Sequence, residues 1–282
     1  MKSIRLAAAL LCVPAVASFG QLSKNPPKGP LVEFEMMTWP EVKDAMAHGK
    51  TVAIVPTGGT EQRGPQNANG GHNLMSKYIA KNIAIRLGNA IVMPVLPYTP
   101  NNANPALPGT IGLTPELLTA VLTRVVEQTI ANGFKTVVIT NDHGGGFPNA
   151  YKAVVDSLEP KYAPKGIHIF YADEVYGKAQ ADFDKWLADN GYPVSSHAGI
   201  PDTGTMLYLD STNVWVRRDL IADAVGDPPA QRGAGAQQQG TRRNNGISGD
   251  ARKSTPELGK KAMDMKIDYA VKQIQEFMAK TK

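Results

Sequence analysis

Three side chains that commonly bind metals follow two apolar stretches of this 282-residue sequence. Glu61 and His72 lie in the Gly-rich segment after residues 51–56 (TVAIVP), and His143 follows residues 135–140 (KTVVIT). A carboxylate and two imidazoles form a three-ligand set with an open fourth position, which is the composition of a catalytic zinc site. These residue types therefore predict a metal centre that is built for catalysis.

Each of these residues also has a purely structural interpretation. Glu61 could form an ion pair with Arg63 inside its own turn, and His72 could cap a helix that starts near Asn73. His143 could lie in a tight turn between a strand and a helix and cap that helix. Spacing alone leaves both interpretations open.

Short Val- and Ile-rich segments separated by helical segments predict the scaffold that positions these residues. Strands are expected at residues 51–56, 90–96, 135–140 and 166–171. Because these segments are apolar throughout instead of alternating, they indicate a parallel sheet that is covered on both faces. The expected fold is a single α/β domain with a mainly parallel sheet and helices on both faces. Ligands of such sheets bind beyond the carboxyl ends of the strands, where Glu61 and His143 lie.

Capping residues and apolar periodicity predict the helices and the boundaries of the domain. Helices are expected over residues 38–48, 74–87, 114–133 and 255–280. Residues 21–37 are expected to form an extended leader, and residues 38–282 the domain itself. Residues 227–245, which are rich in Gly, Gln and Pro, are expected to form a mobile loop inside that domain because one helix follows them.

Residues 1–20 have the pattern of a secretory signal peptide. Two basic residues are followed by the apolar residues 6–16 and then by small residues up to Gly20. The expected protein is therefore exported and is periplasmic or secreted. The single cysteine, Cys12, lies in this segment, so the mature chain would have no thiol. Cys12 could instead carry a lipid, although the residue before it, Leu11, is not small.

Composition and charge narrow the classes of partner. With 42% hydrophobic and 20% charged residues, the chain can bury a core, which excludes wholesale disorder. Loss of Lys2 and Arg5 with the signal peptide lowers the net charge from +5 to +3, which is too small to indicate nucleic-acid binding. No later apolar segment approaches the roughly 18 residues of a membrane span. The expected partner is a small-molecule substrate.

Five ordered segments resemble the creatininase (creatinine amidohydrolase) family, over residues 39–277. Residues 58–66 (GGTEQRGPQ) resemble the family pattern Gly-x-x-Glu-Gln-His-Gly-Pro-His, and residues 141–146 (NDHGGG) resemble Asn-Gly-His-Gly-Gly-Asn. Residues 197–204 (HAGIPDTG) resemble His-Ala-Gly-Glu-x-Glu-Thr-Ser. Two further segments agree, residues 107–111 (LPGTI) and 246–250 (GISGD). The resemblance implies a creatininase-like three-layer sandwich.

The resemblance implies a centre that holds two metal ions in the family and one in this chain. The ligands of one family metal correspond to Glu61 and His143. Two ligands of the other correspond to Arg63 and Gly145, which cannot bind a metal because arginine stays protonated and glycine has no side chain. The bridging Asp of the family corresponds to His72. We expect Glu61, His72 and His143 to hold one ion, with zinc as the expected metal and manganese or iron as alternatives.

Four further residues of these patterns carry predictions. Asp142 replaces a Gly and could be an additional metal ligand or could orient one. Arg63 could occupy the space of the missing metal or bind a substrate carboxylate there. His197 corresponds to the histidine that transfers a proton in the family. Asp202 could hold a ligand or His197 in place, or it could cap a helix over residues 203–209. We expect His197, Asp202 and Arg63 to be the catalytic residues.

The resemblance implies a metal-dependent hydrolase of a non-peptide carbon–nitrogen bond in a small amide, such as a cyclic one. The altered ligands indicate that the substrate is not creatinine. A metal-dependent lyase or isomerase that acts on a carbonyl substrate is one alternative. A catalytically inactive periplasmic binding protein is another. Because the family commonly forms hexamers, we also expect a homo-oligomer.

Overall fold

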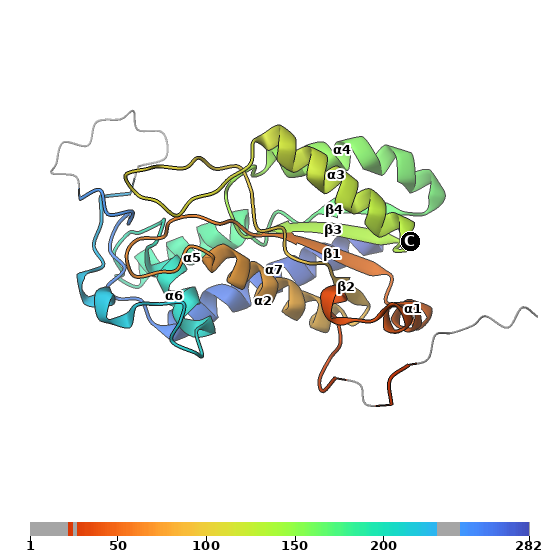
Figure 1. The fold of residues 1–282 in the computed structure, drawn as a ribbon, viewed down its shortest axis with the longest axis horizontal. Helices are drawn as coiled ribbons and strands as arrows, with labels where there is room; N and C mark the ends of the chain where they lie inside the picture. Colours follow the sequence, from red (N-terminus) through yellow and green to blue (C-terminus); the bar gives the residue numbers. More distant parts are fainter. Residues whose placement is uncertain (1–21, 25–26, 230–242, 282) are drawn as a thin grey trace, which may run out of the picture.

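The fold of the chain is built around a four-stranded sheet in the order β2-β1-β3-β4 (Figure 1). It is given by a computed structural model that describes residues 22–24, 27–229 and 243–281. The strands are β1 (Val52–Thr57), β2 (Ala90–Val92), β3 (Thr136–Asn141) and β4 (His168–Tyr171). All the pairings are parallel, so the carboxyl ends of the strands meet at one edge.

Helices cover both faces of this sheet and form the two outer layers (Figure 1). One face packs against α3 (Pro115–Ala131) and α4 (Asn149–Tyr162), and the other against α2 (Gly71–Leu87) and α7 (Pro256–Lys280). Successive residues of β1 alternate between the two cores, with Ala53 and Val55 in one and Val52 and Ile54 in the other. The expected α/β fold, a parallel sheet between two helical layers, is confirmed.

The remaining helices surround this sandwich. They are α1 (Trp39–Ala47), α5 (Gly177–Asp189) and α6 (Ile200–Leu209), with short 3-10 helices at Phe34–Met36, Ala163–Lys165 and Arg218–Asp223. The predicted capping box forms at the start of α1, where Glu41 accepts a hydrogen bond from the Thr38 N–H at 2.7 Å. Both α5 and α6 pack against α7. They therefore extend the helical layer beyond the carboxyl ends of the strands (Figure 1).

Three element boundaries differ from the sequence-based expectations. Strand β2 ends at Val92 instead of residue 96, because Pro94 has no N–H for the ladder. Strand β4 begins at His168, after Gly166 has ended a 3-10 helix in the left-handed conformation (φ 68°). Helix α2 begins at Gly71, earlier than expected, so His72 lies inside its first turn and does not cap it.

Parts of the predicted leader and loop are also described. Val32 is buried, and its carbonyl oxygen accepts a hydrogen bond from the Val92 N–H at 2.7 Å, so the end of residues 21–37 packs against β2. At the ends of the predicted loop, Asp227 Oδ1 accepts a hydrogen bond from the Arg243 N–H at 2.6 Å. Residues 230–242 lie outside the described residues, as do the predicted signal peptide and Cys12. No helix among the described residues is long and apolar enough to cross a membrane.

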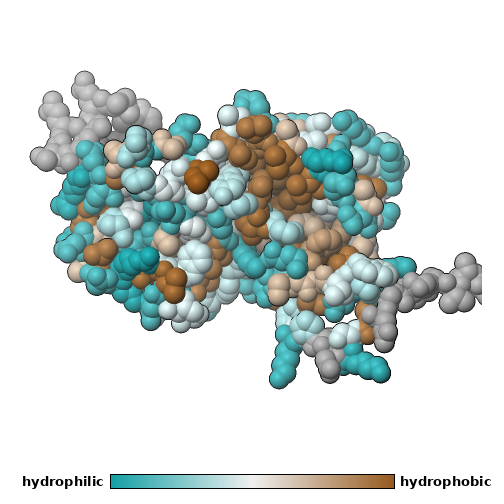
Figure 2. All heavy atoms as spheres, viewed as in Figure 1, coloured by the Kyte–Doolittle hydropathy of each residue, from teal (hydrophilic) through white to brown (hydrophobic). Residues whose placement is uncertain are grey.

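An apolar area lies over α3 on the face drawn in Figure 2. Leu117 and Val121 of α3 are 54% and 37% exposed. A groove of about 420 Å³ beside this helix is lined mainly by apolar side chains, among them Val95, Leu96 and Val125. Exposed apolar areas of this kind are typical of surfaces that contact another protein.

Candidate metal centre

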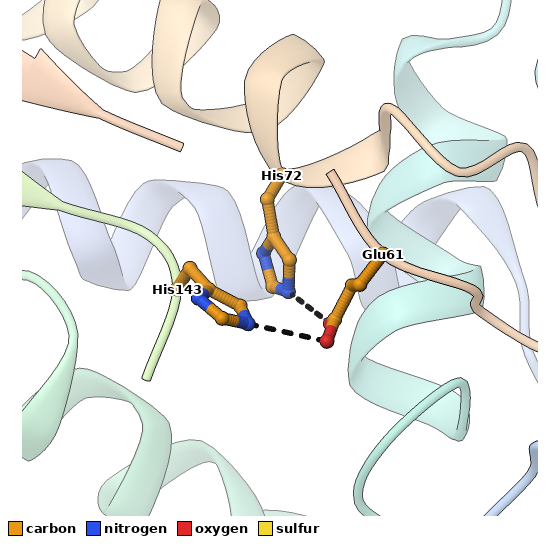
Figure 3. Close-up of side chains that lie close together, drawn as sticks. All are labelled: Glu61, His72 and His143. Carbon is orange, nitrogen blue, oxygen red and sulfur yellow. Dashed lines mark hydrogen bonds and ion pairs between the residues drawn. The ribbon is translucent and has the colours of Figure 1, made fainter. Parts of the chain in front are cut away.

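Glu61, His72 and His143 lie together at the carboxyl edge of the sheet (Figure 3). Glu61 Oε1 lies 3.0 Å from His72 Nε2, and Glu61 Oε2 lies 3.1 Å from His143 Nε2. Each of the three residues offers one potential ligand atom, and these three atoms lie within 4.8 Å of one another. All three residues are buried. The structure thus brings together the three predicted metal ligands.

The charge states of His143 and Glu61 suit a divalent metal. Burial lowers the pKa of His143 more than its hydrogen bond to Glu61 raises it, so its imidazole is neutral near pH 7. Burial alone would raise the pKa of Glu61, but hydrogen bonds from His143, His197 and His72 hold that pKa far below its usual range. A neutral imidazole and an ionised carboxylate are the forms that bind metals.

The segment after β2 supplies hydrogen-bond partners for two of these ligands. Thr99 Oγ1 lies 2.7 Å from His143 Nδ1, and Asn101 Nδ2 donates to Glu61 Oε2 at 2.9 Å. Such partners fix the orientation of ligands in metal sites. Neither Thr99 nor Asn101 was expected from the sequence, because neither is a usual metal ligand and neither lies in a segment that resembles the family patterns.

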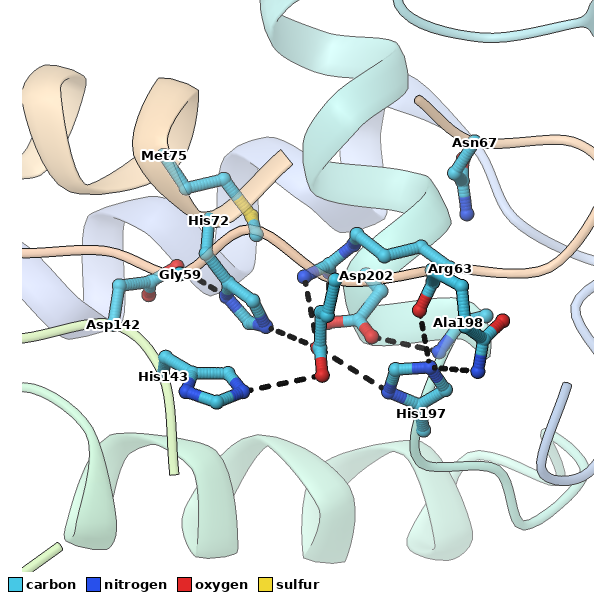
Figure 4. A network of polar contacts seen from close by, with 12 residues as sticks. Gly59, Arg63, Asn67, His72, Met75, Asp142, His143, His197, Ala198 and Asp202 are labelled. Atoms are coloured by element: carbon cyan, nitrogen blue, oxygen red, sulfur yellow. Dashed lines mark hydrogen bonds and ion pairs between the residues drawn. The ribbon is translucent and has the colours of Figure 1, made fainter. Parts of the chain in front are cut away.

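Asp142 lies beside His72 (Figure 4), at the ring nitrogen opposite to the one that contacts Glu61. Its Oδ2 atom is 3.1 Å from His72 Nδ1, and it is not part of the ligand cluster. Burial alone would raise the pKa of Asp142, but the charge of Lys266 and the hydrogen bond from His72 lower it to about 2. This position favours the orienting role over that of an additional ligand.

Lys266, on α7, is a third candidate functional residue that was not expected from the sequence. Its Nζ atom forms an ion pair with Asp142 Oδ1, and the residue is only 6% exposed. It lies on the apolar face of α7 with the buried residues Met263, Ile267 and Ala270. A lysine within an apolar helical stripe is itself a signal, because an unpaired buried ammonium group is costly.

Arg63 is fully buried and lies near two carboxylates, of which Asp202 is labelled beside it in Figure 4. Its Nη2 atom lies 2.6 Å from Asp202 Oδ1, and its Nη1 atom lies 3.7 Å from Glu61 Oε1. The side chain is absent from the lining of the cavity at the metal centre. Its placement supports the expectation that Arg63 fills the space of the missing metal. It does not support a direct contact between Arg63 and a substrate carboxylate, because the guanidinium group has no exposed surface.

Asp202 stabilises the turn that presents His197. It is the third residue of α6, and its Oδ2 atom accepts a hydrogen bond from the Ala198 N–H at 2.7 Å. Ala198 has a φ of 55°, a left-handed conformation that is unfavourable for residues other than glycine. The cap residue of α6 is Gly199, so the structure favours the interpretation that Asp202 holds His197 in place.

His197 faces the ligand cluster from the side of α6 (Figure 4). Its Nε2 atom lies 2.7 Å from the Gln62 carbonyl oxygen, and its Nδ1 atom lies 3.4 Å from Glu61 Oε1. Burial alone would lower the pKa of His197, but the hydrogen bond and the charge of Glu61 raise it above its usual value. The side chain is 30% exposed, so a protonated imidazole can reach a bound molecule.

A cavity of about 410 Å³ opens onto the cluster. The predicted residues Glu61, His72, Asp142, His143, His197 and Asp202 contribute to its wall, together with Lys266. Its other polar lining residues include Asn101, Tyr176, Gln180, Asp184 and Ser196. The size and the mixed lining are those of a site for a small molecule.

The backbone at Gly145 leaves no room for a side chain. A Cβ atom there would lie 2.2 Å from the Pro100 carbonyl oxygen and 2.7 Å from His143 Nδ1. Replacing Gly145 with alanine is therefore expected to destabilise the protein by about 1–3 kcal/mol, and Gly145→Glu to bind no second metal ion. Denaturant unfolding and metal analysis check these outcomes.

The adjacent Gly144→Ala is the matched control for this change. Its Cβ atom would meet the end of the Tyr176 side chain at 3.1 Å, a contact that a small side-chain movement relieves. A Gly145→Glu protein that folds normally and holds two ions would show that the second metal site is intact.

Comparisons with known proteins agree with this geometry. Residues 35–274 match the creatininase family model, described as creatinine amidohydrolase. The chain is 29% identical over 112 residues to a creatinine amidohydrolase of Pseudomonas putida, a match that covers 38% of this chain and 43% of that protein. It is 26% identical over 117 residues to a 3-dehydro-scyllo-inosose hydrolase of Thermotoga maritima, covering 41% and 37%. The matched part thus spans less than half the length of these curated relatives.

Solved structures extend the likeness of the fold to nearly the whole chain. A manganese form of creatininase superposes with a TM-score of 0.70 at 21% identity, covering 88% of this chain and 98% of that chain. A Zn–Zn form of creatininase is similar as well. Because the family model covers most of the sequence and the described fold agrees with it, this chain belongs to the creatininase family.

Proposed function

We propose that this protein is a metal-dependent hydrolase of a non-peptide carbon–nitrogen bond in a small amide, cyclic amides included. The observation that carries the proposal is the cluster of Glu61, His72 and His143 in the wall of a 410 Å³ cavity, with His197 beside Glu61. When bound there, a divalent ion would polarise a carbonyl group and lower the pKa of water.

The charges around the cluster favour one ion per chain. Asp142 is paired with Lys266, and Asp202 is paired with Arg63. The carboxylates of Asp142 and Asp202 are therefore neutralised by cations of the protein. Glu61 is left as the carboxylate that contacts both His72 and His143. Zinc suits the mixed oxygen and nitrogen ligands, and manganese or iron are the alternatives.

The residues of the chain have separate roles in this proposal. His197 donates a proton to the departing nitrogen, because its imidazole is exposed to the cavity and its pKa is raised. Asn101 and Thr99 orient Glu61 and His143. Arg63 lies behind the cavity wall and pairs with Asp202, which lines the cavity and supports the turn that carries His197.

Metal analysis and an activity panel test the proposal. About one divalent ion per chain is expected, and Glu61→Gln is expected to lose most of it, because an amide is a weaker ligand than a carboxylate. The panel should contain cyclic amides, formamides and other small amides, with creatinine as the expected non-substrate. A protein that holds no metal and hydrolyses none of these amides would support the inactive binding protein instead.

A second candidate is a metal-dependent enzyme whose substrate is not an amide. One relative is named for the hydrolysis of 3-dehydro-scyllo-inosose. The amide and hydroxyl groups of Asn101, Gln180 and Ser196 in the cavity wall can also bind a hydroxylated carbonyl compound. Product analysis in ¹⁸O-labelled water separates a hydrolase from an isomerase, because a hydrolase incorporates solvent oxygen and an isomerase does not. A new amino group in the product then separates the hydrolysis of an amide from the hydrolysis of another bond.

Export and oligomerisation are further parts of the proposal. The basic and apolar pattern of residues 1–20 supports export, and N-terminal sequencing of the exported protein is expected to find a start near Ser18 or Gln21. The apolar area over α3 supports a homo-oligomer. Light scattering that gives a monomer mass at micromolar concentration would contradict this second expectation.

A further inference from the structure

A buried lysine lies at one end of a chain of polar contacts that reaches the candidate metal ligands. Lys266 Nζ pairs with Asp142 Oδ1, and Asp142 Oδ2 lies 3.1 Å from His72 Nδ1. His72 Nε2 then lies 3.0 Å from Glu61 Oε1. These contacts link α7, the end of β3 and the first turn of α2, so the chain of contacts joins three separate parts of the fold.

Lys266 and Asp142 neutralise each other's charge in the interior of the protein. Their side chains are only 8% and 1% exposed, and either charge alone would be costly to bury. A neutral apolar residue at position 266 would continue the buried stripe of α7. Position 142 is a glycine in the family pattern that the sequence resembles, so that pattern has no carboxylate with which a lysine could pair at this place.

The Lys266–Asp142 pair can fix the orientation of the His72 ring. His72 stands where the family pattern has a bridging carboxylate, and its two ring nitrogens face different groups. If Nδ1 carries a proton and donates it to Asp142, Nε2 points toward Glu61 and His143 and can bind a metal. Among the described residues, Lys266 is the one lysine or arginine that pairs with the Asp142 carboxylate.

We propose that Lys266 is a positioning residue of the metal centre. Its ammonium group holds the Asp142 carboxylate where it accepts the hydrogen bond from His72 Nδ1, which directs His72 Nε2 toward the metal. The inference rests on the proposed function. It adds a residue on α7, far along the sequence from the ligands, to the groups that determine metal affinity.

Metal affinity of the full-length protein tests this role. Lys266→Met and Asp142→Asn are each expected to weaken Zn²⁺ binding by about 10–100-fold, the range seen when the outer partner of a metal-bound histidine is lost. The double variant should lose less than the two single losses combined, because both residues act through one contact. Zn²⁺ competition with a chelator measures all three affinities.

Lys260→Met is the matched control for Lys266→Met. Lys260 lies on the same helix and pairs with Asp264 at 2.6 Å, but both side chains are more than half exposed. Its replacement removes a lysine of α7 without changing the contacts of Asp142, so Zn²⁺ affinity should not change. A folded Lys266→Met protein with the affinity of the unchanged protein would overturn the proposal.

A second measurement needs neither enzyme activity nor a bound metal ion. In imidazole ¹H–¹⁵N spectra of the metal-free protein, the Nδ1 proton of His72 is expected to be shifted downfield and protected from exchange, with His72→Gln used for assignment. A His72 without a proton on Nδ1 would overturn the proposal. If this signal is present but the protein binds no zinc, the contact holds and the proposed function fails.

Discussion

Replacing Arg63 with methionine is expected to destabilise the fold by about 3–5 kcal/mol, the cost of leaving a buried charge without its partner. Arg63 is fully buried, and its guanidinium group lies 2.6 Å from Asp202 and 3.7 Å from Glu61. Methionine has a similar length, so the change removes the charge while keeping much of the volume. Chemical unfolding of the metal-free protein measures this effect without any assay of activity.

Two further variants make the Arg63 result interpretable. Arg252→Met removes an arginine whose side chain is 53% exposed in its pair with Asp250, and it should cost about 0–1 kcal/mol. The double variant Arg63→Met/Asp202→Asn should recover part of the loss, because it no longer buries an unpaired Asp202 carboxylate. An Arg63→Met protein as stable as Arg252→Met would show that Arg63 does not neutralise the site.

Arg63→His tests whether the family's second metal can be restored. The change supplies an imidazole at the position of one missing ligand, but Gly145 still has no side chain and no space for one. The variant is therefore expected to remain at about one ion per chain and to lose stability, because Asp202 loses its guanidinium partner. One bound ion per chain in this variant would indicate that the missing ligand at Gly145, and not Arg63 alone, prevents a second metal ion from binding.

Replacing His197 with asparagine is expected to lower kcat by about 10²–10⁴-fold, the usual contribution of a residue that transfers a proton in the transition state. Asparagine keeps a polar group near the Gln62 carbonyl oxygen, which lies 2.7 Å from His197 Nε2. Because His197 is not one of the clustered ligands, the metal content should not change. Kinetics on the substrate found in the amide panel, with metal analysis of the same sample, checks both parts.

His168→Asn is the matched control for the His197 change. His168 lies in β4, and its Nδ1 atom is 2.8 Å from Glu159 Oε1, outside the cavity at the metal centre. Its replacement should leave kcat unchanged. If His197→Asn lowers kcat by less than tenfold, another group donates the proton. If it removes the metal, His197 is required for metal binding.

The sequence by itself determined the architecture and the metal-ligand cluster. The unalternating Val and Ile segments predicted a parallel sheet, and the positions of Glu61 and His143 after two of its strands predicted that they would meet. This succeeded because the carboxyl ends of neighbouring parallel strands lie at one edge of the sheet. β1 and β3 are direct neighbours, so residues that follow them are close in space.

The tertiary structure alone decided what surrounds those ligands. Lys266 and Asp142 are 124 residues apart, and Thr99 approaches His143 from the segment after β2. No local pattern records such contacts, because side-chain pairing depends on how α7 and that segment pack against the sheet. Arg63 likewise could have contacted a substrate or replaced a metal. Its complete burial against Asp202 favours the second role, because the free energy of burying a guanidinium group depends on the charges that folding places beside it.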